Sequence, residues 1–161
     1  MLAPTQLLGL WRLQRRLVDR IPGRSGRVDG MLELTGHEDE VRWSERGLLT
    51  WGDEQLRVTR ELRICRDDDE SGWLVCFEDG RLFHPWHPGV PVVHECAADT
   101  YRGVIDVDPT WTRLRVLWDV TGPDKQQRLY TRCARVLTPV EAAALAARRK
   151  HAGQPSSTSS T

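Results

Sequence analysis

The sequence is dominated by short segments in which apolar and polar residues alternate. In QLRVTRELRICR, Leu56, Val58 and Leu62 share one face, whereas polar and charged side chains share the other. A period of two residues is typical of β-strands that bury one face and expose the other. Further segments with this period are GRVDGMLEL, EVRWSERGLLTW, GWLVCF, RLFHPW, RLRVLWDV and QQRLYTRCARV. The pattern therefore predicts an all-β protein.

Short connections between these segments predict how the strands are arranged. Gly52-Asp53, Ser71-Gly72 and Gly122-Pro123-Asp124 are typical of tight turns. Consecutive strands joined by tight turns form an antiparallel meander, which folds into a sandwich or a closed up-and-down barrel. A barrel leaves no strand edge exposed, and about eight strands enclose room for one small ligand. We therefore predict a closed antiparallel up-and-down barrel of about eight strands.

The two ends of the chain do not alternate in this way. Residues 4–9 predict a helical turn before the first strand. Thr138, Pro139 and Glu141 form a typical helix start ahead of an alanine-rich segment, so we predict a C-terminal helix over 138–152. The Ser/Thr-rich stretch 153–161 predicts a disordered tail. The chain has 161 residues, and we expect residues 1–152 to form one domain.

Composition argues against several classes of partner. The chain has 23 basic and 23 acidic residues, whereas nucleic-acid-binding proteins usually carry an excess of basic side chains. No apolar run is long enough to cross a bilayer, and the first residues lack the charge order of a secretory signal. The four cysteines form no CxxC pair, so we expect free thiols. These features predict a cytoplasmic protein without a membrane or nucleic-acid partner.

Several motifs resemble those of known proteins. Gly9-Leu10-Trp11 resembles the Gly-x-Trp motif that opens the first strand of lipocalins and other calycins. In those barrels an arginine near the end of the last strand packs over the tryptophan, and this place falls to Arg132, or less well to Arg135. FEDGRLFH, HECAADTY and WDVTGPDK resemble motifs of a small calycin-like family of bacterial and fungal proteins of unknown function. The resemblance covers residues 8–137 and implies a barrel with a candidate lumen, but no particular reaction.

Three polar residues are expected to face the interior of this barrel. In VVHECAADTY, taken as one strand, His94 and Cys96 share the face opposite Glu95. His84 is in phase with an apolar neighbour in RLFHPW, and Arg60 lies among the apolar residues of QLRVTRELRI. A charge in such a place is costly unless it is paired. We predict that Arg60, His84 and His94 converge in one cavity, suited to a partly apolar ligand with an anionic group.

Other residues complete the predicted ligand site. Trp118 has the best inward phase of the tryptophans, and we expect the others at the barrel ends or against the C-terminal helix. Tyr101 is a candidate ligand-binding residue, but it could instead form a structural hydrogen bond at the end of a strand. Lys125, in a loop at the expected barrel mouth, either attracts an anion or is simply solvated. The predicted ligand-binding set is Arg60, His84, His94, Cys96, Tyr101, Trp118 and Lys125, with Trp11 and Arg132 as a structural pair.

Two further chemistries use the same histidine-rich stretch. His84, His87, His94 and Cys96 together offer ligands for zinc or haem, but alternation sends the first two to opposite faces. We therefore predict no metal and no cofactor. Covalent catalysis would use Cys96 as nucleophile, His94 as base and Asp99 as its orienting partner. A free cysteine is more often a small core residue, so we assign no catalytic residue.

Three functions compete on this basis. The first, which we favour, is a cytosolic protein that binds one small, partly apolar molecule in its lumen. The second is an isomerase, cyclase or hydrolase of a small hydrophobic metabolite, with His94 as acid or base. The third is an interaction module whose barrel is filled by side chains. The volume of the lumen separates the third from the others, because ligand sites usually exceed about 300 Å³.

Overall fold

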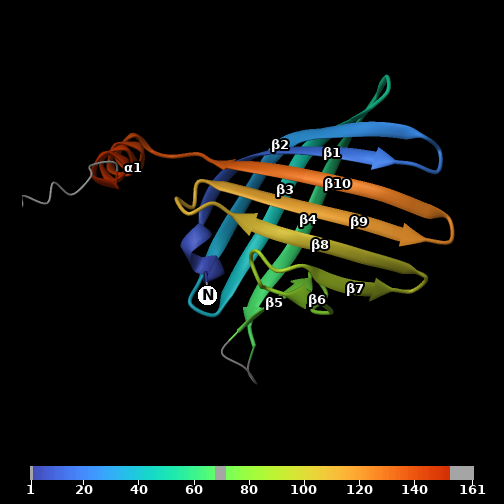
Figure 1. The fold of residues 1–161 in the computed structure, drawn as a ribbon, viewed down its shortest axis with the longest axis horizontal. Helices are drawn as coiled ribbons and strands as arrows, with labels where there is room; N and C mark the ends of the chain where they lie inside the picture. The colour runs from blue at the N-terminus through green and yellow to red at the C-terminus, as the bar shows by residue number, and fades with distance from the viewer. Residues whose placement is uncertain (1, 68–71, 153–161) are drawn as a thin grey trace, which may run out of the picture.

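The computed structural model describes residues 2–67 and 72–152, which form an antiparallel β-barrel followed by one α-helix (Figure 1). The predicted tail at 153–161 lies outside the described residues. The strands are β1 (Gly9–Asp19), β2 (Arg24–His37), β3 (Glu40–Trp51), β4 (Glu54–Arg66), β5 (Trp73–Phe77), β6 (Leu82–Pro85), β7 (Val92–Cys96), β8 (Asp99–Val107), β9 (Arg113–Gly122) and β10 (Lys125–Arg135).

The strands form one continuous sheet in the order β6-β5-β4-β3-β2-β1-β10-β9-β8-β7. Each strand pairs with its neighbour in sequence, except where β1 pairs with β10 to bring the first and last strands together. The two edge strands, β6 and β7, lie side by side, but no ladder of hydrogen bonds joins them within the described sheet. We call this boundary between β6 and β7 the seam. The predicted up-and-down barrel is confirmed, and it is nearly closed.

The barrel has ten strands, whereas the sequence predicted about eight. The difference arises partly in HECAADTY, which we took for one strand with a bend. It is a hairpin: β7 ends at Cys96, β8 begins at Asp99, and Ala97 takes a left-handed conformation with φ of 53°. The hairpin places His94 directly opposite Tyr101. His94 and Tyr101, which we expected on a single strand, therefore lie opposite each other on two neighbouring strands.

The interior is filled mainly by aromatic and branched side chains. Contrary to our expectation, most of the tryptophans lie in the core rather than at the barrel ends. Each of these five is at most 5% exposed: Trp11, Trp43, Trp73, Trp86 and Trp118. The 3-10 helix η1 (Pro4–Leu7) closes one end, since Trp11 Nε1 donates to the Leu7 carbonyl at 3.0 Å. Large rings thus occupy much of the space that a wide lumen would need.

The predicted packing of an arginine over Trp11 occurs, but Arg132 is the wrong residue. The Arg135 guanidinium carbon lies 5.7 Å from the centre of the Trp11 ring, whereas Arg132 lies over Tyr130 at 5.8 Å. The reason is the strand register, because Trp11 pairs with Arg135 across β1 and β10. Arg132 is exposed on the outer face of β10, while Trp11 is buried inside.

The C-terminal helix α1 (Pro139–Ala152) begins at the predicted cap. The Glu141 amide donates to Thr138 Oγ1 at 3.3 Å, and the Thr138 amide donates to the Glu141 carboxylate at 2.8 Å, which is a capping box. Figure 1 shows that α1 stands apart from the barrel, so it does not cover the tryptophans as we expected. None of the described helices has the length and apolar character to cross a membrane.

Candidate functional site

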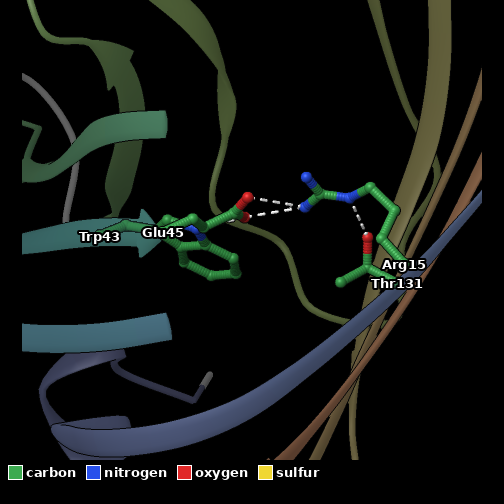
Figure 2. Close-up of polar contacts among 4 residues, drawn as sticks. All are labelled: Arg15, Trp43, Glu45 and Thr131. Carbon is green, nitrogen blue, oxygen red and sulfur yellow. Dashed lines mark hydrogen bonds and ion pairs between the residues drawn. The ribbon is translucent and has the colours of Figure 1, made fainter. Parts of the chain in front are cut away.

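The interior contains a polar cluster that we call the inner network: Arg15, Trp43, Glu45 and Thr131 (Figure 2). Arg15 Nη2 donates to Glu45 Oε1 at 2.9 Å and forms an ion pair with Glu45 Oε2 at 2.8 Å. Arg15 Nε donates to Thr131 Oγ1 at 2.7 Å, and Trp43 Nε1 donates to Glu45 Oε1 at 2.8 Å. The buried carboxylate is therefore satisfied by an arginine from β1 and an indole from its own strand, β3.

Our sequence analysis missed the inner network, although the alternation of residues along the strands indicates that its members face inward. Arg15 follows Trp11 and Leu13 at intervals of two along β1, and both of those residues are buried. Glu45 follows Trp43 in the same way along β3. A buried ion pair leaves an uncompensated charge when one partner is removed. The charges of Arg15 and Glu45 neutralise each other, and the evident role of the network is structural.

A second set of polar side chains, the outer group, consists of Arg60, His84 and His94. All three surround the ring of Phe83 on β6. The Arg60 guanidinium carbon lies 5.7 Å from the Phe83 ring centre, and the rings of His84 and His94 lie 4.8 and 5.1 Å from it. The three residues, from β4, β6 and β7, therefore gather around one ring, but they do not line one cavity, because His84 and His94 line different spaces.

Arg60 differs from Arg15 in having no hydrogen-bonded or ionic partner among the described residues. It is half-buried, and no hydrogen bond or ion pair to its side chain occurs within residues 2–67 and 72–152. Glu45 is its neighbour across β3 and β4, but that carboxylate already binds Arg15. Burial lowers the pKa of Arg60, an effect that Glu45 opposes and Arg15 reinforces. Because arginine stays protonated in proteins, an unneutralised positive charge faces the interior.

His84 is neutral at physiological pH. It is 3% exposed, and burial lowers its pKa from the ordinary 6.5 to about 4. Its Nδ1 lies 2.7 Å from the Pro85 carbonyl oxygen. A carbonyl only accepts hydrogen bonds, so Nδ1 carries the proton and Nε2 keeps its lone pair. His84 therefore contributes an acceptor, not a charge, beside Arg60.

Aromatic rings form the walls around the outer group. His94 is half-buried, and its ring centre lies 5.9 Å from Phe77 and 6.2 Å from Tyr101. Trp118 stacks beneath Phe83, with ring centres 4.9 Å apart and planes 24° apart. Gly103, opposite Trp118 on β8, makes room for the indole, because an added Cβ would lie 2.3 Å from that ring. The hairpin and this glycine together position the aromatic wall.

Two spaces that the described residues enclose near the outer group differ greatly in size. The space next to the inner network, which also touches Arg60, His84 and Trp118, has a volume of only about 20 Å³. The seam cavity, a larger space reaching the surface at the seam, has a volume of about 490 Å³. Its lining includes Arg60, Phe77, Phe83, His94, Cys96 and Tyr101. The deep lumen is filled, whereas the seam cavity exceeds the ~300 Å³ of a usual ligand site.

The other predicted site residues lie in less suggestive places. Cys96 is exposed at the rim of the seam cavity. Lys125 forms an ion pair with Asp99. Asp99 is therefore engaged away from His94, which weakens the idea of a Cys96–His94–Asp99 arrangement. In the part of the chain that the structure describes, no three His, Cys, Asp or Glu side chains are grouped to hold a metal ion.

The sequence and the fold both have relatives. Residues 7–135 match the sequence profile of DUF6314, a family of unknown function. No curated protein sequence matches the chain. An S-type phycobiliprotein lyase, CPES from Guillardia theta, has a similar structure with a TM-score of 0.60 and 11% identity, over 84% of this chain and 91% of its own. The siderocalin Ex-FABP is 12% identical over 91% of this chain and 87% of its own, with a TM-score of 0.38. The similarity to the lyase confirms the calycin-like barrel.

Proposed function

We propose that this protein, which belongs to the DUF6314 family of unknown function, binds a small, partly apolar anion in its seam cavity. The observation that carries the proposal is Arg60. Its guanidinium is half-buried, lines the cavity and has no hydrogen bond or ion pair among the described residues. An anionic group on a ligand would complete this site in the way that Glu45 completes Arg15.

Energetics favour an anionic partner. Withdrawing a charge from water is costly unless another charge or hydrogen bonds compensate for it. Arg15 and Glu45 neutralise each other, and the burial that lowers the pKa of His84 keeps that ring uncharged. Arg60 therefore leaves the inward-facing groups near the cavity with one excess positive charge. Arginine binds carboxylates through paired, charge-assisted hydrogen bonds, which are among the strongest in proteins.

The walls of the cavity favour a partly apolar ligand. Phe77, Phe83 and Tyr101 present rings to a space of about 490 Å³, within the usual range for small-molecule sites. A few polar groups in an apolar cavity orient the ligand, whereas the apolar walls supply most of the binding free energy. Arg60 and His94 line the cavity and are the proposed orienting groups, whereas His84 lines only the small space behind Phe83.

The proposal extends to the setting in which the protein works. We propose that residues 1–152 act as one domain, because β1 pairs with β10 and so joins the two ends of the barrel. We also propose a cytoplasmic location, supported by the four free thiols, Cys65, Cys76, Cys96 and Cys133.

A fluorescent probe tests the proposal directly. We expect 1-anilinonaphthalene-8-sulfonate, an apolar anion, to bind saturably at one site. Arg60→Leu should weaken this binding about tenfold or more, because the charge that holds the sulfonate is lost. Arg57→Leu is the matched control, since Arg57 is exposed on the opposite face of β4. Absence of saturable binding, or equal losses in the two variants, would contradict the proposal.

A further inference from the structure

We infer that the ligand is a compact, flat molecule with a ring system and a single carboxylate, held entirely within the seam cavity. This inference rests on the proposed function and names the class of ligand. Three features support it: where space exists, which side chains form the walls, and how the charges near the cavity add up.

The distribution of space excludes a long chain along the barrel axis. The space on the far side of Phe83, next to the inner network, amounts to only about 20 Å³, less than one methylene-rich tail requires. Phe83 is 5% exposed and stacks on Trp118, so these two rings close the floor between the two spaces. A ligand bound through Arg60 must therefore fit beside this floor. It cannot extend past Trp118 toward the inner network.

The side chains around the cavity favour a flat partner. Phe77 and Phe83 lie 4.8 Å apart, and His94 meets Phe83 edge-on at 86°. Tyr101 also meets Phe83 edge-on, with ring centres 6.3 Å apart. Aromatic rings in offset or edge-to-face contact gain more than their buried area alone provides. A rigid ring system can make several such contacts at once, whereas a flexible chain loses rotamer entropy and makes none.

The charges near the cavity match one negative group. Among the described residues that line the cavity, Arg60 is the cation without an ion pair, whereas Arg81, at the exposed rim, pairs with Asp79 at 2.7 Å. Glu95 also lies at the rim, where it is exposed and accepts a hydrogen bond from Thr100 at 2.6 Å. A second carboxylate on the ligand would meet no second free cation among these groups, and it would be repelled by Glu95. A single carboxylate is therefore the best match.

Calorimetry with a small set of probes tests the inference. We expect 2-naphthoate to bind the full-length protein about tenfold or more tightly than palmitate, because palmitate needs an elongated space. Naphthalene-2,6-dicarboxylate and 2-naphthalenemethanol should each bind more weakly than 2-naphthoate, by carrying one charge too many or none. Palmitate or the dicarboxylate binding as tightly as 2-naphthoate would overturn the inference. If Arg60→Leu instead bound every probe as tightly as the parent protein, the proposed function itself would be refuted. The two failures are therefore distinguishable.

A second pair of variants tests the role of the rings. Phe77 is half-buried at the cavity wall, so Phe77→Leu should fold normally. We expect Phe77→Leu to weaken the binding of 2-naphthoate about threefold or more and to leave any binding of palmitate unchanged. Phe77→Tyr keeps the ring and should bind 2-naphthoate like the parent. Equal losses for both probes, or equal losses in both variants, would overturn the inferred flat ligand.

Discussion

Two arginines point into the same barrel and meet opposite surroundings. Arg15 binds Glu45 and Thr131, and its side chain is 12% exposed. Arg60 sits across β3 and β4 from the same Glu45, yet it has no bonded partner among the described residues. A single carboxylate thus lies between two guanidiniums and binds one of them. The comparison separates a charge that stabilises the fold from a charge that is available to a ligand.

Removing the shared carboxylate should have the largest effect. Glu45→Leu leaves Arg15 and the Trp43 indole without their acceptor, so we expect the free energy of unfolding to fall by about 3–5 kcal/mol. Urea denaturation measures this change. Glu33→Leu is the control, because the Glu33–Arg46 pair is 44% and 71% exposed and should contribute less than about 1 kcal/mol. Similar losses in the two variants would contradict a structural role for the inner network.

The acid response of His84 should distinguish the outer group from the inner network. The pKa of His84 is lowered from 6.5 to about 4 by burial, so between these values the unfolded chain takes up a proton that the folded chain does not. The free energy of unfolding should therefore decrease as the pH falls from 6.5 to 4, by up to about 3 kcal/mol. Denaturation at several pH values measures this change.

A pair of histidine variants isolates this response. His84→Gln should lose the part of the pH dependence that lies between 6.5 and 4, because glutamine does not titrate in this range. His87→Gln, at an exposed position, should keep it. An unchanged pH profile in His84→Gln would show that the response arises elsewhere.

Strand phase predicted much of this architecture and some of the site. It placed Arg60, His84 and His94 in one interior, and the structure gathers them around Phe83. It failed where two strands were taken for one, because nothing in HECAADTY marks Ala97 as a residue that turns the chain. The contact between His94 and Tyr101 depends on that turn.

Two other misses had evidence in the sequence. Arg15 and Glu45 lie in the same phase as their buried neighbours, so the reasoning that singled out Arg60 applies to them equally. Arg135 is in phase with the buried Thr131 and Cys133, whereas Arg132 is in phase with the exposed Tyr130. What phase could not supply was pairing between strands. The identity of the arginine that binds Glu45 depends on three-dimensional neighbours, not on alternation.

The cysteines offer a smaller contrast between the two regions. Cys96 is exposed at the seam cavity, whereas Cys133 is 3% exposed near the inner network and burial raises its pKa to about 12. We expect Cys96 to react with a disulfide reagent at least about tenfold faster than Cys133 in the folded protein. Mass spectrometry of partially labelled protein identifies the modified residues. Comparable rates would indicate that the inner network opens as readily as the seam.

Arg60→Leu should have the smallest effect on stability, although it has a large effect on ligand binding. The substitution leaves no buried partner behind, because no described side chain is bonded to Arg60. It also removes a half-buried positive charge that lies near Arg15 and is disfavoured by burial. We therefore expect the free energy of unfolding without ligand to change by less than about 1 kcal/mol, or to increase. Arg15→Leu, measured beside it, should lose about 3 kcal/mol or more, because Glu45 is then left unpaired. If Arg60→Leu destabilised the protein as much as Arg15→Leu, Arg60 would be part of the structural framework, and the distinction between the two arginines would no longer hold.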